Sequence, residues 1–174
     1  PRYIDGSPHE PVVTQALISV LNTDCTFFDV GANVGFYSVL SSQFATCGSV
    51  HAFEMDPHLI SVINSHFELN DVSNVDISVV CAAISDYSGK SVSFRPQLSG
   101  NKSTNSVIKN DRKYTRMRIP TLSLDEYCSE VNASPDVLKI DVEGFESSVL
   151  DGAKRTIKGS EKLFVEIHPT LLNK

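Results

Sequence analysis

Charged side chains interrupt two stretches of the sequence that otherwise have the apolar character of buried strands. Lys139, Asp141 and Glu143 alternate in "VLKIDVEGFE", and Glu166 and His168 alternate in "LFVEIHP". Residues that alternate along a strand lie on one of its faces, so we expect these side chains to meet at the ends of two neighbouring strands. Buried charges must pair, change their pKa or bind a ligand.

These residues could carry out acid–base chemistry. A histidine titrates near neutral pH, so His168 could take a proton from a hydroxyl group while Asp141 or Glu166 orients its ring. A divalent cation on the same three side chains could also ionise a hydroxyl. We do not favour the cation, because one imidazole and two acids at these positions are not a diagnostic spacing. The structural alternative is a set of salt bridges in which Lys139 neutralises an acid.

A second group of chemically suggestive residues lies in "FFDVGANVGFYSVL", where an apolar run gives way to a new apolar pattern. Gly31 and Gly35 would let the backbone approach a ligand closely at a strand-to-helix turn. Dinucleotide turns usually read G-x-G-x-x-G, but Asn33 stands where the middle glycine would be. Asp29 would repel a pyrophosphate, yet it suits a ligand with an ammonium and a sulfonium group, such as S-adenosylmethionine.

Glu54 lies at the end of the next predicted strand, where an acid can accept hydrogen bonds from both ribose hydroxyls of an adenosine cofactor. That role is shared with NAD sites, so Glu54 does not distinguish the two cofactors. Each acid has an ordinary alternative, since Asp29 could cap a turn and Glu54 could be a surface residue. Together, at matching strand ends, they favour a nucleoside site.

The order of the predicted elements brings both groups of residues to one edge of a sheet. Apolar strands are predicted at 25–30, 49–54, 75–84, 137–141 and 162–167, with helices before and between them, the first capped by the residues 7–10. This alternation indicates an α/β fold with a mostly parallel sheet and helices on both faces. In such sheets ligands bind beyond the carboxyl ends of the strands.

The segment 95–118 carries seven basic residues and one acidic residue, a net charge of +6, against −12 for the rest of the chain. Short strands at 91–94 and 117–119 would enclose it as a hairpin insertion. The segment is either a solvated loop or a lid over an anionic small-molecule acceptor.

The 174 residues suit a single domain. We divide it into an N-terminal helix (1–23), a cofactor-binding half (24–90), the hairpin with its basic loop (91–121) and a substrate-side half (122–174). The sequence has no apolar run long enough to span a membrane and no secretory pattern. Cys25, Cys47, Cys81 and Cys128 are widely spaced, which indicates reduced thiols. We therefore expect a cytoplasmic protein without membrane or nucleic-acid partners.

Six segments resemble successive motifs of the FkbM family of S-adenosylmethionine-dependent methyltransferases, and they cover roughly residues 24–169. They are "FFDVGANVGFYS", "VHAFEMDP", "CAAISDYSG", "TLSLDEY", "VLKIDVEGFE" and "LFVEIHP". The resemblance implies a Rossmann-like class I methyltransferase fold, usually with seven strands. The chain ends five residues after Pro169, so we expect the last two strands to be absent. The activity implied is methylation of an oxygen, often a hydroxyl of a sugar or natural product.

The resemblance also implies roles in binding S-adenosylmethionine and its product S-adenosylhomocysteine. Asp29 and the turn with Gly31, Asn33 and Gly35 would hold the methionine part of the cofactor, and Glu54 would bind the ribose. Met55 would pack on the adenine, whose edge Ala82 and Ala83 would border. The ordinary alternatives are a helix-entry residue for Met55 and core packing for the two alanines.

We therefore predict a methyltransferase that acts on a hydroxyl of a small acceptor. A non-catalytic binding module for an adenosine ligand would need the cofactor turn but not the polar residues of the two strands. A nicotinamide-dependent oxidoreductase would need the pyrophosphate pattern that the turn lacks.

Overall fold

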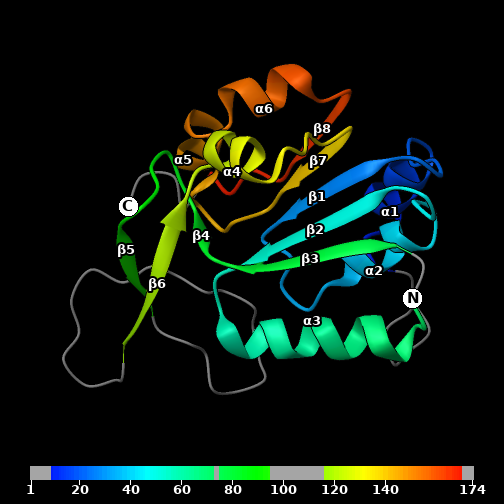
Figure 1. Cartoon of the computed structure of the whole chain (residues 1–174), viewed down its shortest axis with the longest axis horizontal. Coiled ribbons are helices and arrows are strands. Elements are labelled where there is room, and N and C mark those ends of the chain that lie inside the picture. The colour runs from blue at the N-terminus through cyan, green and yellow to red at the C-terminus, as the bar shows by residue number, and fades with distance from the viewer. Residues whose placement is uncertain (1–8, 73–74, 95–115, 170–174) are drawn as a thin grey trace.

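The computed structural model describes residues 9–72, 75–94 and 116–169. They form a five-stranded parallel sheet in the order β3-β2-β1-β7-β8 and a three-stranded sheet in the order β4-β6-β5 (Figure 1). The strands of the main sheet are β1 (Thr26–Val30), β2 (Ser49–Glu54), β3 (Asp76–Cys81), β7 (Val137–Ile140) and β8 (Lys162–Val165). The predicted α/β fold with a parallel sheet is confirmed.

Helices cover both faces of the main sheet, as predicted. One face packs against α1 (Pro11–Ile18), α2 (Phe36–Ser42) and α3 (Pro57–Leu69). The other packs against α4 (Leu124–Val131), α5 (Glu146–Asp151) and α6 (Lys154–Gly159). Alternation along β1 divides the core, because Phe27 joins the first layer and Phe28 the second. None of the helices in the described parts of the chain is long and apolar enough to cross a membrane.

Parallel register brings the carboxyl ends of β1, β7 and β8 to one edge of the sheet. Val30 pairs with Ile140, which pairs with Val165. The ladder continues one residue further, because Asp141 donates its N–H to the Val30 carbonyl and Glu166 to that of Ile140, both at 2.9 Å. The strand order reverses between β1 and β7, and sheets of this kind bind their ligands at such a reversal.

The small sheet begins where β3 ends. The chain passes from β3 into β4 (Ala83–Ile84), which pairs with β6 (Met117–Leu122), and β6 has β5 (Ser91–Phe94) as its antiparallel neighbour. The single strand predicted at 75–84 is therefore wrong, whereas the predicted hairpin is present. Most of the basic segment, residues 95–115, lies outside the described residues.

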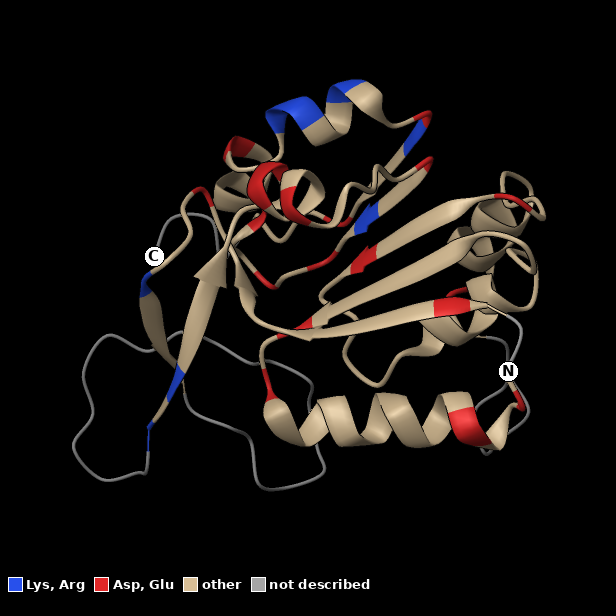
Figure 2. Ribbon diagram, viewed as in Figure 1, with Lys and Arg blue, Asp and Glu red and all other residues tan. Residues whose placement is uncertain are grey.

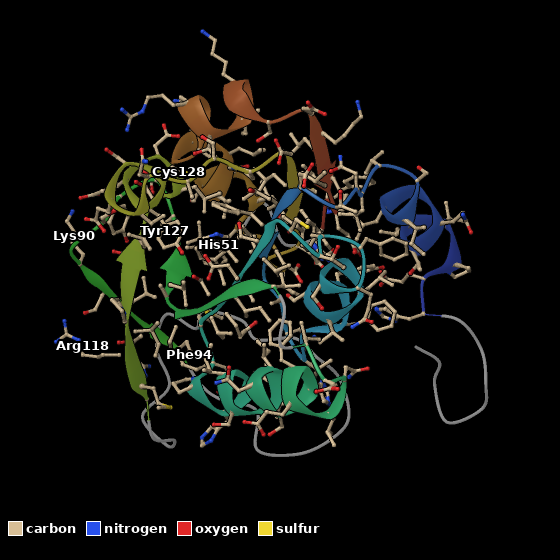
Figure 3. The ribbon with its side chains drawn as sticks, turned by 45° about the vertical axis from the view of Figure 1, so that its right-hand side comes forward. His51, Lys90, Phe94, Arg118, Tyr127 and Cys128 are labelled. Carbon is tan, nitrogen blue, oxygen red and sulfur yellow. The ribbon has the colours of Figure 1, made fainter. Side chains whose placement is uncertain are left out.

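Helix α4 ties the end of this small sheet to the main one. Tyr127 of α4 and His51 of β2 lie side by side (Figure 3), with the phenolic oxygen 2.8 Å from Nδ1 of the ring. Burial lowers the pKa of His51. We assign this pair to the core of the second layer.

Several predicted element boundaries are wrong. The first helix begins at Pro11, directly after the predicted cap at 7–10, of which residues 7 and 8 lie outside the described residues. β7 ends at Ile140 and β8 at Val165, so the polar residues follow these strands instead of extending them. Glu143 in particular leaves the strand direction, because its φ of +53° is left-handed.

Candidate functional site

Glu54 ends β2 and is only 6% exposed, so it is not a surface acid. Its Oε2 accepts the N–H of Asn33 and its Oε1 accepts that of Asp56, both at 2.9 Å. Burial raises the pKa of Glu54 to about 7, although these hydrogen bonds oppose the change. Each oxygen of a carboxylate can accept more than one hydrogen bond. The group is therefore fixed by the backbone and still able to accept hydroxyl donors.

The turn between β1 and α2 has three left-handed residues, with φ of +81° at Gly31, +54° at Asn33 and +79° at Gly35. A Cβ at Gly31 would lie 1.9 Å from the carbonyl oxygen of Asp141, and one at Gly35 would lie 3.1 Å from Ile63 of α3. The sequence suggested that these glycines make room for a ligand. Protein fills the space that a Cβ would occupy at either position, so the glycines permit the turn to pack against the end of β7 and against α3. Their approach to a ligand stays a prediction.

Asp29 lies opposite Lys139 in the sheet and is 1% exposed. Its Oδ2 accepts a hydrogen bond from Ser38 at 2.7 Å, whereas Oδ1 has no hydrogen-bond partner among the described residues and lies 3.9 Å from Lys139 Nζ. Burial raises the pKa of Asp29, and Lys139 and Ser38 oppose that change. Asp29 therefore makes its contacts inside the protein, with Ser38 in the first turn of α2 and with Lys139.

Lys139 joins the two predicted groups of residues. Its Nζ lies 3.3 Å from Asp141 Oδ2 and 4.9 Å from the centre of the Tyr37 ring, in addition to its contact with Asp29. Figure 2 shows basic colour on β7 next to acidic colour on β1, which is its neighbour in the sheet. The salt-bridge set predicted as the structural alternative is therefore present.

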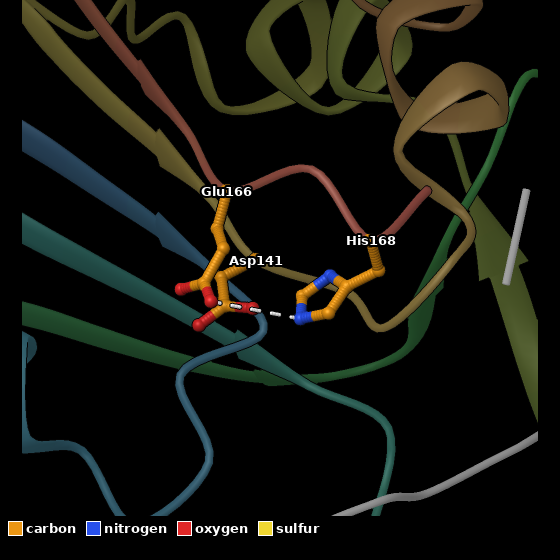
Figure 4. Close-up of side chains that lie close together, drawn as sticks. All are labelled: Asp141, Glu166 and His168. Atoms are coloured by element: carbon orange, nitrogen blue, oxygen red, sulfur yellow. Dashed lines mark ion pairs between the residues drawn. The ribbon is translucent and has the colours of Figure 1, made fainter. Parts of the chain in front are cut away.

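Asp141, Glu166 and His168 lie together beyond the ends of β7 and β8 (Figure 4). One carboxylate oxygen or ring nitrogen from each lies within 4.8 Å of those of the other two. Nε2 of His168 is 3.6 Å from Glu166 Oε1. The side chain of Asp141 is 26% exposed and that of Glu166 is 49% exposed, so solvent reaches the group. The structure thus brings the three catalytic candidates together, and their roles stay predictions.

The other ring nitrogen of His168 is held by Glu146, the first residue of α5, which is not among the predicted site residues. Oε1 of Glu146 lies 2.8 Å from His168 Nδ1 and accepts the N–H of Gly144 at 2.9 Å. Burial favours a higher pKa for Glu146, but these hydrogen bonds outweigh it and lower the pKa. The same bond raises the pKa of His168. Glu146 is the last acid of "VLKIDVEGFE", but an acid in a first helical turn is common, so only the tertiary contact distinguishes it.

The residues predicted to border adenine lie next to the end of β2. Met55 directly follows Glu54 and is half-buried. Ala82 is 6% exposed and donates its N–H to the Glu54 carbonyl at 3.2 Å, while Ala83 is half-buried at the start of β4. Ala82 belongs to the core, which agrees with core packing, the ordinary alternative for this residue. Contact of these residues with adenine stays a prediction.

The architecture agrees with that of solved methyltransferases. The alignment with a precorrin-6y C5,15-methyltransferase from Geobacter metallireducens covers 93% of this chain and 64% of that one, with a TM-score of 0.56 and 16% identity. An rRNA methylase from Streptococcus thermophilus gives a TM-score of 0.58 at 9% identity, over 93% and 72% of the two chains. These likenesses show the fold, which is that of class I methyltransferases.

The family follows from the sequence. The family model described as "Methyltransferase FkbM domain" matches residues 29–173, and the chain belongs to this family. It is 29% identical to Hexuronic acid methyltransferase AglP of Haloferax volcanii over 160 residues, which are 91% of this chain and 62% of that protein. It is 25% identical to Methyltransferase 1 of Beauveria bassiana over 146 residues, 74% and 58% of the respective lengths. The chain thus spans about three fifths of the length of these relatives.

Proposed function

We propose that the chain is an S-adenosylmethionine-dependent methyltransferase that methylates a hydroxyl of a small acceptor. The observation that carries this proposal is the carboxylate of Glu54, buried at the end of β2 and fixed by the N–H groups of Asn33 and Asp56. It is suited to bind both hydroxyls of a ribose beside the point where the strand order reverses. Membership of the FkbM family supports the chemistry.

The residues around Glu54 suit this cofactor, except that the buried Asp29 has no direct role in binding it. In the proposed complex Glu54 binds the ribose, Met55 packs on the adenine, and the turn from Gly31 to Gly35 borders the methionine part. The bound cofactor supplies an electrophilic methyl group on its sulfonium and leaves as S-adenosylhomocysteine. Asp29 is 1% exposed, so we assign it an indirect role through Lys139.

The polar residues beyond β7 and β8 would serve the acceptor. Methyl transfer requires the acceptor oxygen to lie in line with the sulfur–methyl bond and to lose its proton. The turn at Gly31 packs on the backbone of Asp141, so the two sites are adjacent. Because Glu146 accepts the proton on Nδ1 of His168, the neutral ring has its lone pair on Nε2, on the side of Asp141 and Glu166. This group could take up the acceptor's proton.

We propose a sugar acid as the class of acceptor. The support is the similarity to a protein named as a hexuronic acid methyltransferase. An anionic acceptor would also fit the positive net charge of segment 95–118, which lies mainly outside the described residues. We retain the cytoplasm as the proposed location, since all four cysteines are free.

The proposal is tested by incubating the chain with methyl-labelled S-adenosylmethionine and a panel of sugars and sugar acids. We expect labelled product from a sugar acid, formed in step with S-adenosylhomocysteine, and loss of both in Glu54→Ala at limiting cofactor. Binding of S-adenosylhomocysteine without transfer to any acceptor would favour a non-catalytic binding module. Binding of NAD in its place would contradict the proposal.

A further inference from the structure

We propose that Asp141, Glu166 and His168 form a binding site for a divalent transition-metal cation. They offer two carboxylate oxygens and one imidazole nitrogen, a mixed set suited to ions such as Mn²⁺, Fe²⁺ or Zn²⁺. The sequence alone did not favour a cation, because the spacing of the three residues is not diagnostic. Their arrangement in the folded chain changes that judgement (Figure 4).

The separation of the His168 and Glu166 side chains suits two ligands of one ion better than a direct hydrogen bond. Nε2 of His168 and Oε1 of Glu166 are 3.6 Å apart, which is too long for a hydrogen bond. Two adjacent ligands, each about 2.1 Å from one cation, are separated by roughly 3.0–3.4 Å in octahedral or tetrahedral geometry. All three candidate ligand atoms lie within 4.8 Å of one another. Two ligands about 2.1 Å from one ion lie at most about 4.2 Å apart, so the side chains would have to move closer together on binding, which the 49% exposure of Glu166 permits.

Glu146 provides the second, independent observation. It is 2% exposed and lies 2.8 Å from Nδ1 of His168, so a neutral ring with its proton on Nδ1 has the Nε2 lone pair on the side of Asp141 and Glu166. Metal-binding histidines usually donate their other N–H to such a carboxylate, which fixes the ring and its tautomer. Oε2 of Glu146 is buried and has no hydrogen-bond partner among the described residues. Burial of this acid is costly and is understandable if the ring it orients binds an ion.

The local charge also favours a cation. The carboxylates of Asp141, Glu143, Glu146 and Glu166 all interact with His168, while Lys139 supplies a positive charge 3.3 Å from Asp141. Carboxylates gathered in this way repel one another, and a divalent ion would compensate them. The partial exposure of Asp141 and Glu166 would leave coordination positions open to water or to acceptor oxygens.

The catalytic use of the ion rests on the proposed methyltransferase function, but its binding does not. Coordination of the acceptor hydroxyl would lower the hydroxyl pKa, and its proton would pass to solvent water. The oxygen would then donate an electron pair to the methyl carbon while the sulfur–carbon bond breaks and its electrons stay on sulfur. In this arrangement His168 is a metal ligand and no longer the general base.

The test is a titration of the full chain with Mn²⁺, followed by calorimetry and by electron paramagnetic resonance, without cofactor or acceptor. We expect one Mn²⁺ per chain. His168→Ala and Asp141→Asn should each weaken binding at least about tenfold, and Glu146→Gln by about 10–100-fold, the usual effect of losing such an orienting carboxylate. Glu161→Gln is the matched control, because Glu161 stands at the opposite end of β8 and the charge change is that of Glu146→Gln.

Absence of saturable Mn²⁺ binding would overturn the inference, as would equal affinity of His168→Ala and the unmodified chain. Thermal unfolding of each variant checks its fold. His168→Ala and Asp141→Asn change partly exposed residues, so they keep the test decisive if the buried Glu146→Gln fails to fold. A parallel titration with S-adenosylhomocysteine separates the two proposals. Binding of S-adenosylhomocysteine but not Mn²⁺ contradicts the metal site alone, and the reverse result contradicts the proposed function alone.

Discussion

The acids near the ends of β1 and β2 are buried, whereas those beyond the ends of β7 and β8 are partly exposed. Asp29 and Glu54 are 1% and 6% exposed, and each accepts hydrogen bonds from the protein. Beyond β7 and β8 the side chains of Asp141 and Glu166 are 26% and 49% exposed and surround one imidazole. Backbone N–H groups hold the carboxylate of Glu54 in the first region, whereas contacts between side chains hold the second.

This difference suggests a division of work. A carboxylate fixed by the backbone needs little rearrangement to bind a cofactor, so affinity should depend on the β1–β2 end. Exposed acids with unbalanced charge can adapt to an acceptor or a cation, so turnover should depend on the β7–β8 end. Mutations in the two regions should therefore have separable effects.

The largest effect should come from His168→Ala. Whether Nε2 takes a proton or binds an ion, its loss should lower turnover by about 10²–10⁴-fold. Affinity for S-adenosylhomocysteine, measured by calorimetry, should stay within about twofold because the ring lies outside the β1–β2 end. His58→Ala, an exposed histidine at the start of α3, is the control and should be fully active. If His168→Ala weakened cofactor binding as much as turnover, the two regions would not be separable.

The next effect concerns the point where the two regions touch. Gly31→Ala would place a Cβ 1.9 Å from the Asp141 carbonyl oxygen at a φ of +81°, so we expect a loss of at least about 2–3 kcal/mol in the free energy of unfolding. Gly89→Ala has a similar φ of +75° but nothing within 4 Å of the added Cβ, and should cost only about 1–2 kcal/mol. Urea denaturation of both variants measures the difference. Equal losses would mean that the contact with Asp141 does not constrain the turn.

The smallest effect is a pH dependence confined to the β1–β2 end. Burial raises the pKa of Glu54 from its ordinary value of 4.5 to about 7. At pH values between 4.5 and about 7, Glu54 keeps a proton in the folded state that it has released in the unfolded chain. This group therefore favours folding at low pH, and that contribution is lost as the pH rises through about 7.

Ribose hydroxyls should bind the ionised carboxylate best, so affinity for S-adenosylhomocysteine should fall as the pH decreases below 7, by up to about tenfold per unit. Calorimetry at several pH values measures this, and Glu54→Gln should show weak affinity with little pH dependence. The same pH dependence in Glu54→Gln would assign the proton to another group.

Local signals in the sequence predicted strand β2 of the first region, which has the predicted bounds. Helix caps are local features of the same kind, since Asp56 and Ser123 accept the N–H of His58 and Glu126 on their side-chain oxygens. Each of these features depends on residues within a few positions of one another. Helix α6 was missed, because its six residues are too few to show an apolar period.

The second region depends on contacts that no local pattern contains. Glu146 and His168 are 22 residues apart and meet only because β8 lies beside β7. The bend between β3 and β4 is equally hidden, since apolar alternation does not say which sheet a residue joins. The packing of Gly31 is hidden for the same reason, because its neighbour is the backbone of Asp141.

The central claim is that Glu54 anchors the ribose of S-adenosylmethionine, and a calorimetric titration tests it most directly. The unmodified chain should bind S-adenosylhomocysteine with one site and should not bind NAD. Glu54→Ala should lose about 1.5–3 kcal/mol of that binding free energy, the value of hydrogen bonds to a charged group. Unchanged affinity in Glu54→Ala, or binding of NAD in preference to S-adenosylhomocysteine, would contradict the account.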